Sequence, residues 1–418
     1  MAADRAKNKS AILDERRKAV ILEATRLINS RGVSAIRLSD LAARLKMPRK
    51  SLYYYAQNRE AVVAACFTMT CDLLEEGLDL AYGPADLALT GFIRHQFSDE
   101  TRSAVALVDV DWLPPGAGHT IHERMKRITQ RLAALIERGS REALFVSHPP
   151  MIAAHILLSM LSWARTSQQW TDDLTLNPNR VAAALCDIIL NGIATDAKAA
   201  PDPMLDLSLI SSPTPDIFDR EQLHRARIER LAQAASGLFN RNGIEATSID
   251  DIAMAIGITK GSIYHHFPSK AALVASCYER AYQIQSQILE VARSNAANGA
   301  HWLRNAVYLN SLAHVEGIAP LATLPGIQSL PDDLRERVMS GIGGLFATVS
   351  RIYELGISDG SIRELDYVIA DSVVGGAMAW VPQWLGDFKS VAKRELAEQI
   401  NAILFTGLRK RQEAARRG

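Results

Sequence analysis

Cysteine is scarce in this sequence, with four residues among 418. The thiols of Cys66, Cys71, Cys186 and Cys277 form no CxxC pair and no Cys/His spacing of the kind that binds zinc. A chain this long with so few cysteines does not depend on a disulfide framework. The pattern indicates reduced thiols and a cytoplasmic location, and it predicts neither a metal site nor a cofactor.

Long hydrophobic runs and an excess of charge are also missing. The longest apolar stretches, residues 151–161 and 373–381, are too short to cross a bilayer. The N-terminus is charged and lacks the apolar core of a signal peptide. The net charge is +1, which excludes a strongly basic surface overall, although a small basic face is enough to bind phosphates. We expect a soluble protein without membrane contact.

Enzyme motifs are absent as well. The chain contains no P-loop, nucleophile elbow, HExxH pair or GxGxxG after a strand, so we predict no catalytic residues and no enzyme activity. Alternating strand patterns are missing too. Apolar residues recur at helical spacing instead, as in Val20, Ala24 and Leu27. The predicted fold class is all-α.

What the sequence does contain is an internal repeat. Gly32 and Gly243 align at an offset of 211 (243 − 32), and without gaps the same offset pairs Ser51 with Ser262, Tyr53 with Tyr264 and Cys66 with Cys277. Farther along, Trp163 and Trp380 align at a looser offset of 217 (380 − 163). Self-similarity on this scale predicts one structural unit written twice.

The repeat divides the chain into five segments. We expect a small head with an N-terminal arm at 1–62, a helical domain at 63–198, a linker at 199–220, a second head at 221–273 and a second helical domain at 274–418. The linker contains Pro201, Pro203, Pro213 and Pro215, which favour an extended segment.

The second copy carries a helix-turn-helix pattern. Ser248 and Asp251 have the spacing of a capping box that starts a helix, and Gly257 ends that helix after two turns. Thr259 then caps a further helix over residues 260–266. Two short helices joined by such a turn place the second one in the major groove of DNA.

This segment resembles the DNA-binding head of the TetR (tetracycline repressor) family. The resemblance rests on Thr247-Ser248, Ile252-Ala253, residues 257–267 and Ser269-Lys270. It implies a three-helix head followed by a helical domain that dimerises and binds a small effector. In that family the effector changes the spacing of the heads and releases operator DNA, so a repressor is the default expectation.

The predicted DNA-binding residues lie at matched places in the two copies. They are the following residues of copy one: Arg37, Arg49, Lys50, Ser51, Tyr53, Tyr54 and Arg59; and the following of copy two: Thr247, Ser248, Thr259, Lys260, Gly261, Ser262, Tyr264, His265 and Lys270. Basic and tyrosine side chains suit phosphates, whereas serine and histidine can reach base edges.

Copy one departs from the family pattern. Lys46 stands in place of Gly257, Pro48 in place of Thr259 and Ala56 in place of Phe267. We interpret Pro48 as the first residue of the recognition helix, where its missing N–H costs little, and Tyr55 as a substitute for the lost ring. An alternative is that this head only packs and no longer binds DNA.

Two different heads in one chain predict a pseudo-dimer within a single polypeptide. Helices over 151–170 and 179–193 should then form a four-helix bundle with those over 367–385 and 391–408. Such a protein would bind an imperfect palindrome. The resemblance also implies an effector pocket in each half, with the following candidate lining residues: Trp112, His155, Trp163, Trp302, Tyr308, His314 and Trp380. Most of these are equally typical of a hydrophobic core.

Other interpretations remain open at this point. The whole chain could be a ligand-binding or partner-binding module that has lost DNA recognition. Cys66 and Cys277 could form a redox switch, although buried filler is the commoner role. His119 and His122 have helical metal-ligand spacing but no third ligand. The basic run 409–417 is expected to be a solvated, frayed end.

Overall fold

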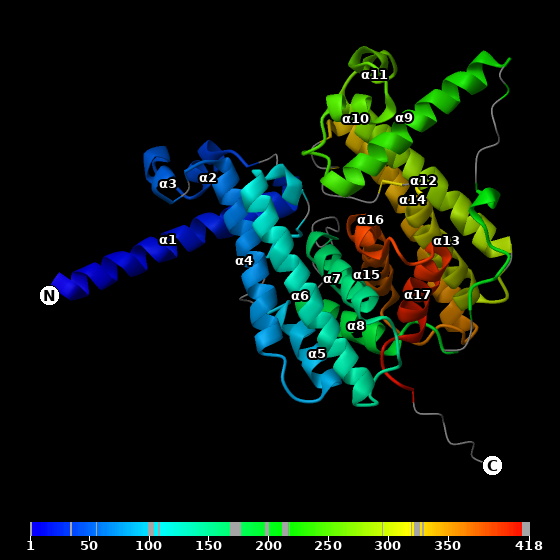
Figure 1. The fold of residues 1–418 in the computed structure, drawn as a ribbon, viewed down its shortest axis with the longest axis horizontal. Coiled ribbons are helices and arrows are strands. Elements are labelled where there is room, and N and C mark those ends of the chain that lie inside the picture. Colours follow the sequence, from blue (N-terminus) through cyan, green and yellow to red (C-terminus); the bar gives the residue numbers. More distant parts are fainter. Residues whose placement is uncertain are drawn as a thin grey trace.

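The computed structural model describes residues 2–33, 36–55, 57–98, 104–107, 109–167, 177–196, 200–210, 216, 218–294, 296–318, 320–321, 327 and 330–411. Every regular element within these ranges is a helix, and the described backbone adds only two isolated β-bridges. The all-α prediction is confirmed. We call α1–α8 the first half of the protein and α9–α17 the second half (Figure 1).

The two halves contain matching helices in the same order, except that the single helix α7 of the first half corresponds to two helices, α15 and α16, of the second. The first half consists of α1 (Ala2–Arg31), α2 (Leu38–Arg44), α3 (Arg49–Tyr55), α4 (Arg59–Asp79), α5 (Ala85–His95), α6 (Pro115–Arg141), α7 (Pro150–Ser167) and α8 (Pro178–Asn191). The second half consists of α9 (Arg220–Asn242), α10 (Ile249–Ile256), α11 (Lys260–His266), α12 (Lys270–Ser294), α13 (Gly299–Glu316), α14 (Asp332–Ser358), α15 (Tyr367–Ala379), α16 (Val381–Trp384) and α17 (Lys393–Thr406). Short 3-10 turns lie at η2 (Val110–Trp112), η3 (Leu207–Leu209) and η5 (Leu385–Phe388).

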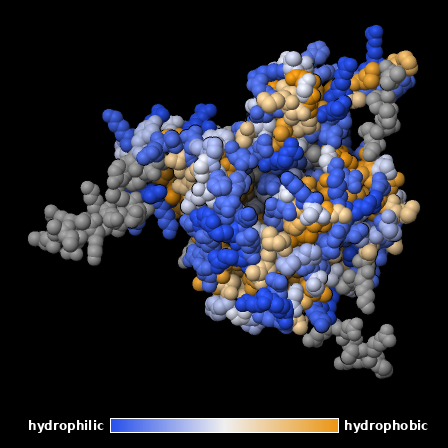
Figure 2. All heavy atoms as spheres, in the orientation of Figure 1, coloured by the Kyte–Doolittle hydropathy of each residue, from blue (hydrophilic) through white to orange (hydrophobic). Residues whose placement is uncertain are grey.

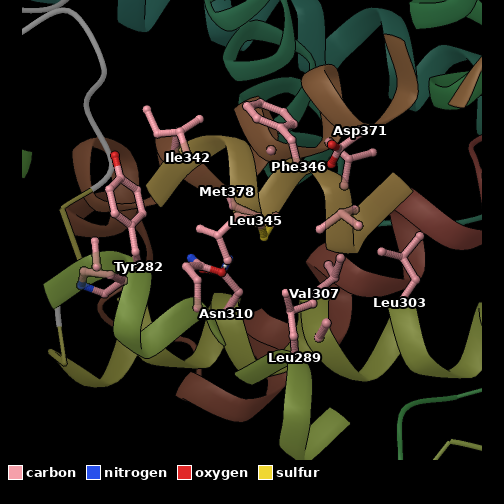
Figure 3. Close-up of a pocket in the computed structure, with 18 of the residues that line it drawn as sticks. Tyr282, Leu289, Leu303, Val307, Asn310, Ile342, Leu345, Phe346, Asp371 and Met378 are labelled. Carbon is pink, nitrogen blue, oxygen red and sulfur yellow. Dashed lines mark hydrogen bonds between the residues drawn. The ribbon is translucent and has the colours of Figure 1, made fainter. Parts of the chain in front are cut away.

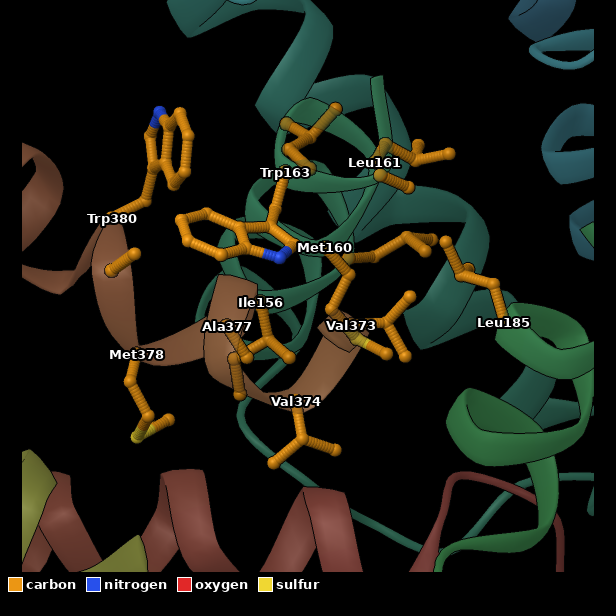
Figure 4. Close-up of a cluster of buried hydrophobic side chains, with 14 of the residues drawn as sticks. Ile156, Met160, Leu161, Trp163, Leu185, Val373, Val374, Ala377, Met378 and Trp380 are labelled. Carbon is orange, nitrogen blue, oxygen red and sulfur yellow. The ribbon is translucent and has the colours of Figure 1, made fainter. Parts of the chain in front are cut away.

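The halves are joined through α7 and α15, which form the most extensive helix contact among the described elements. Helices α8 and α17 pack beside them, so the four helices expected to form a bundle lie together. Figure 4 shows Trp163 and Met160 of α7 among Val373 and Ala377 of α15. A Cβ at Gly376 would overlap the Cβ of Trp163, so this glycine permits the close approach of the two helices.

The C-terminal segments of the two halves cross over each other. Among the described residues, eight backbone hydrogen bonds join the two halves here in four matched pairs; four of the eight join the C-terminal segments to each other, and the other four join them to the segments before α7 and α15. In one pair, Ile193 donates to Leu404 at 3.1 Å while Leu408 donates to Ile189 at 2.9 Å. Gly192 and Gly407 allow the crossing because both have left-handed φ values, of 67° and 76°, and lie directly against the opposite segment.

The part of the linker that the structure describes is anchored to the second half. Leu205 and Leu207 are buried, and Asp206 pairs with Arg394 of α17. The extended linker expected from its prolines is thus partly a packed segment. Residues 197–199, 211–215 and 217 of this region lie outside the described residues.

Two local predictions need correction. The helix expected over 367–385 ends at Ala379, and the separate short helix α16 begins at Val381 with Pro382 in its first turn, because proline supplies no N–H to the preceding turn. The basic C-terminus is not solvated at its start: Arg411 donates to the carbonyls of Ala194 and Asn191, both at 2.7 Å. The rest of that run, 412–418, lies outside the described residues.

The described helices include none that is both long and apolar enough to cross a membrane.

Candidate nucleic-acid interface and effector cavity

The second head contains the helix caps and the turn that its sequence predicts. Ser248 accepts a hydrogen bond from the Asp251 N–H at 3.1 Å, and the Asp251 carboxylate accepts one from the Ser248 N–H at 2.7 Å, which completes the capping box of α10. Gly257 ends the helix at φ 70°, and the Thr259 side chain accepts from the Ser262 N–H at the start of α11. The predicted helix-turn-helix of residues 249–266 is therefore present.

A separate hydrophobic core holds this head together. Phe239, Ile252, Ile263 and Phe267 are all buried in it, together with Tyr278 of α12. Because Ile263 faces this core, the opposite face of α11 is exposed to solvent. The exposed residues of that face are Thr259, Lys260, Gly261, Ser262, Tyr264 and His265.

Several predicted contact residues of the second head have side-chain partners within the protein; in addition to the Thr259 and Ser262 hydroxyls, which lie 2.9 Å apart, three more are paired. Thr247 is fully buried and donates to the Gly243 carbonyl at 2.8 Å, so it supports the head from inside. Ser248 is exposed, but its side chain belongs to the capping box. The Lys260 ammonium pairs with Asp250 at 2.8 Å, which neutralises the cation on this face.

The first head has the same three helices with a strained turn. Lys46 adopts φ 51°, a left-handed conformation that costs a non-glycine residue about 1 kcal/mol or more. Helix α3 begins at Arg49, so Pro48 lies just before the helix and not at its first position; its carbonyl accepts from the Ser51 N–H at 2.8 Å. The side chain of Tyr55 and residue Ala56 lie outside the described residues.

Positive charge is more exposed on the first head than on the second. Arg37, Arg49 and Lys50 are exposed, and the Arg49 guanidinium lies 5.9 Å from the ring centre of Tyr53. Tyr53 is 44% exposed, the same fraction as Tyr264 at the matched position. Ser51 is half-buried, and the side chain of Tyr54 lies outside the described residues.

The last predicted DNA-binding residue of each head, Arg59 or Lys270, interacts with other residues of the protein. The Arg59 guanidinium lies 4.5 Å from the ring centre of Trp112 and donates to the Val33 carbonyl at 2.8 Å. Lys270, its counterpart, is half-buried, and burial lowers its pKa while the carboxylates of Glu245 and Asp109 oppose that shift. Asp109 belongs to the first half, so the body of one half contacts the head of the other.

Asp109 is a buried carboxyl at that contact. A Cβ at Gly243 would overlap its Oδ1, so glycine is required there. Burial, together with the neighbouring Glu245 carboxylate, raises the pKa of Asp109 to about 7, although a hydrogen bond from the Glu245 backbone and the charge of Lys270 oppose the shift.

Both recognition helices lie on the same side of the molecule. In Figure 1, α3 and α11 stand at the upper edge, and α5 and α8 lie at the opposite edge. In the orientation of Figure 2, α6 presents a largely hydrophilic face, whereas hydrophobic atoms gather over the second half around α13 and α16. Both heads therefore lie away from the edge formed by α5 and α8.

A cavity of about 220 Å³ lies in the second half, between α12, α13, α14 and α15 (Figure 3). Its walls are mainly aliphatic and include Leu289, Val307, Leu345 and Met378. Trp163 of α7 also lines it, so the opposite half contributes to the wall. Val374 and Met378 of this wall belong to α15, whose opposite face packs on α7 of the first half (Figure 4).

Two of the residues predicted to contact an effector, Trp163 and His314, line this cavity. The others lie elsewhere. His155 stacks on Trp384 with ring centres 5.1 Å apart, and Trp380 packs on Trp163. Trp302 donates to the Leu289 carbonyl at 2.8 Å, and the Tyr308 hydroxyl lies 3.4 Å from Arg394. Trp112 lies under the first head.

The polar residues of the cavity are not among those predicted from the sequence. Asp371, Tyr353, Asn310 and Tyr282 all line it, and each comes from a different helix. One signal was available: Asp371 interrupts the apolar stretch of α15, where a carboxylate has no structural use.

Other titratable clusters carry no metal site. No group of three or more His, Cys, Asp or Glu residues in the described part of the chain is suitably placed. His122 pairs with Asp111 at 2.8 Å, and both side chains are about half exposed.

Comparison with known proteins settles the family. The sequence pattern of the bacterial regulatory proteins of the tetR family matches residues 20–66 and again residues 231–277. The two matches are 211 residues apart (231 − 20), the offset of the internal repeat. The chain belongs to the tetR family. The pattern of a tetracyclin repressor-like C-terminal domain matches residues 86–193, within the first half.

Relatives of this tetR-family protein match one half of it. The transcriptional repressor KstR2 of Rhodococcus jostii is 28% identical over 213 residues, which is 47% of this chain and 97% of that protein. The structure of the regulator PfmR of Thermus thermophilus is 26% identical, covers 43% of this chain and all of its own, and has a TM-score of 0.37. The structure of AibR with isovaleryl coenzyme A and operator DNA is 23% identical, covers 41% of this chain and 96% of its own, and has a TM-score of 0.36.

Together, the two heads and the family assignment establish a tandem TetR-type, DNA-binding transcriptional regulator.

Proposed function

We propose that this regulator is a repressor that places both heads of one chain on a single operator and releases it when a small, largely apolar effector fills the cavity. The two halves then act as an intramolecular pseudo-dimer. The observation that carries this proposal is the pair of heads on one side of a body whose halves share a core.

The heads favour an operator with unequal half-sites. Arg49 and Lys50 leave the outer face of α3 cationic, whereas Lys260 on α11 is paired with Asp250. Residues 49–53 and 260–264 also differ at most positions. Two recognition helices that contact successive major grooves lie about 34–36 Å apart. An imperfect palindrome with that spacing is the site we expect.

Effector release follows from the shared wall of the cavity. Trp163 comes from the first half, and Val374 and Met378 line the cavity from α15, the helix that packs on α7. A bound molecule that shifts these side chains changes the packing of α7 on α15. Since each head is connected to this packing through its own half, the distance between the heads changes, and one DNA duplex no longer fits both.

The test is equilibrium DNA binding by the full chain, measured by fluorescence anisotropy on its own upstream region and on DNA selected from a random pool. Tyr53→Ala and Tyr264→Ala each remove an exposed ring from one head. Tyr82→Ala is the matched control, because Tyr82 is 82% exposed at the far end of α4. We expect each head variant to weaken binding about tenfold or more and the control to change nothing.

Salt and stoichiometry complete the test. The logarithm of the binding constant should fall by about 0.9 per neutralised phosphate against the logarithm of salt concentration, with one chain bound per operator. If only Tyr264→Ala weakens binding, the first head is a structural partner and the unequal-operator proposal fails. If the wild type binds no selected DNA, the ligand-binding or partner-binding alternative replaces it.

A further inference from the structure

The cavity of the second half contains polar atoms that its apolar walls do not satisfy. The Tyr282 and Tyr353 hydroxyls, Asn310 Oδ1 and His314 Nδ1 are buried without a hydrogen-bond partner within the described part of the chain. Each such atom costs about 1–3 kcal/mol if nothing pairs with it. Four of them around one cavity indicate that a bound molecule supplies the missing partners.

Asp371 adds a carboxyl group to the polar residues that line the cavity. No ion pair or hydrogen bond of Asp371 is present among the described residues, and no lysine or arginine lines the cavity. Aromatic rings of Phe346, Tyr353 and Trp163 line the same space. A carboxylate and the faces of aromatic rings both attract a cation, and a buried carboxylate without a cation is costly.

The polar groups stand at two ends of the cavity. Figure 3 shows Asp371 and Phe346 on one side and Tyr282 on the other, with Met378, Leu345 and Val307 between them. An occupant must therefore be apolar along its body, with its positive group at the Asp371 end.

We propose that this cavity binds an apolar molecule that bears a protonated amine, and that the amine pairs with Asp371 and donates a hydrogen bond to the Tyr353 hydroxyl oxygen. The inference rests on the proposed effector response and names the chemical class of the effector. Asp371 serves as the specificity determinant, because a neutral isostere of the amine leaves the carboxylate unpaired.

The first half has no matching carboxylate. At the offset of 217, Asp371 corresponds to Ala154 and Tyr353 to Ile136 (371 − 154 and 353 − 136), and at the offset of 211, Tyr282 corresponds to Cys71 (282 − 71). Both Ala154 and Ile136 are buried in the core. Each chain thus binds one amine, and a single site serves both heads.

Protonation supports the same assignment. Burial raises the pKa of Asp371 to about 7, so the empty cavity holds a partly protonated carboxyl at neutral pH. The titratable groups that line the cavity from the neighbouring helices are Tyr353, Tyr282 and His314; burial raises the pKa of both tyrosines and lowers that of His314 to about 4. Asp371 is therefore the group that titrates near neutral pH, and binding an amine releases its proton.

The experiment measures binding of n-alkylamines of six to ten carbons, and of the alcohols of equal length, to the full-length protein by calorimetry. The variants are Asp371→Asn, Asp371→Glu and Asp333→Asn. The last is the matched control, since Asp333 is an exposed acid in the first turn of α14. Circular dichroism checks that each variant is folded.

We expect one amine per chain, with affinity rising about tenfold between pH 6 and pH 8 as the carboxyl ionises. Asp371→Asn should weaken amine binding at least tenfold and leave alcohol binding within twofold. Asp371→Glu should retain a preference for amines, and Asp333→Asn should behave as wild type.

Three results overturn the inference: no amine binds at millimolar concentration, amines and alcohols bind equally, or Asp371→Asn binds amines as the wild type does. DNA release is scored separately. If amines bind through Asp371 but leave operator binding unchanged, the effector class stands and the proposed release fails. If a neutral compound alone releases DNA, the release stands and the amine inference fails.

Discussion

The indole rings of Trp163 and Trp380 meet edge to face, with ring centres 5.9 Å apart and planes at 86°. The two residues occupy matched positions in the repeat, so they mark where the halves face each other. Their surroundings nevertheless differ. Trp163 donates to Ser372 at 3.2 Å and lines the cavity, whereas Trp380 does not line it. The helices of the interface are arranged symmetrically, but the cavity beside it is present on one side and is lined by one of the two tryptophans.

Neighbouring glycines of α15 provide a test of this interface. Gly376→Ala places a Cβ against the Cβ of Trp163, which is fixed to its backbone, so α7 and α15 must move apart. We expect a loss of about 1–3 kcal/mol in the free energy of unfolding, measured by urea denaturation. Gly375→Ala is the control, because its Cβ meets nothing within 4 Å. A Gly376→Ala protein as stable as the Gly375→Ala protein would argue against a tight contact.

The turn of the first head is expected to gain stability from glycine. Lys46→Gly removes the strain of a non-glycine residue at φ 51° and should raise the free energy of unfolding by up to about 1 kcal/mol. The reverse change at the matched position of the second head, Gly257→Ala at φ 70°, should lower the free energy of unfolding by a similar amount. Chemical denaturation of both variants checks the pair. A destabilised Lys46→Gly protein would mean that the lysine side chain makes a contact that outweighs the strain.

The pH dependence of stability should report Asp109. Its pKa is raised to about 7 in the folded protein, against an ordinary value near 3.8, so the folded state holds a proton that the unfolded state releases. Stability therefore falls as pH rises from about 4 to about 7 and then levels off. Asp371, whose pKa is raised to the same value, contributes to the same part of the profile, so Asp109→Asn should reduce the slope there without abolishing it. The variant should be more stable than the wild type at pH 8, by on the order of 1–3 kcal/mol. Thermal denaturation across pH is the measurement; an unchanged profile would contradict the buried carboxyl.

The four thiols should be unreactive in the folded protein. All four are buried, and burial raises the pKa of Cys66, Cys71 and Cys277 to about 12 and that of Cys186 to about 11. Since the thiolate is the nucleophile, a disulfide reagent should label none within minutes and all four in denaturant. Rapid labelling of Cys66 or Cys277 in the native protein would restore the redox-switch interpretation over the role of filler.

Local chemistry explains which parts of the fold were predictable. The capping box of Ser248 and Asp251, the turn at Gly257 and the start of α11 after Thr259 all depend on residues within a few positions of one another. Such signals can be recognised in the sequence without knowledge of the tertiary structure. The repeat then carried this assignment to the first head, where Pro48 was misplaced by one residue.

The cavity was not predictable in the same way. Its polar residues come from four helices, and Tyr282 and Asp371 are 89 residues apart (371 − 282). Aromatic residues chosen for their type, such as His155 and Trp380, fill the contact between the halves instead, because large rings are as useful in a core as in a pocket. A lone carboxylate in an apolar helix was the more informative signal.

The crossed C-terminal segments, with Ile193 bonded to Leu404 and Leu408 bonded to Ile189, belong to one polypeptide. In a regulator assembled from identical chains, every mutation is copied into both heads and both pockets, and dilution separates the partners. In the pseudo-dimer proposed here neither applies, because the two halves are encoded separately and stay together at any concentration. The second half can then keep the effector cavity while the first half keeps the more positively charged head. Identical subunits cannot evolve such a difference, because they share one sequence.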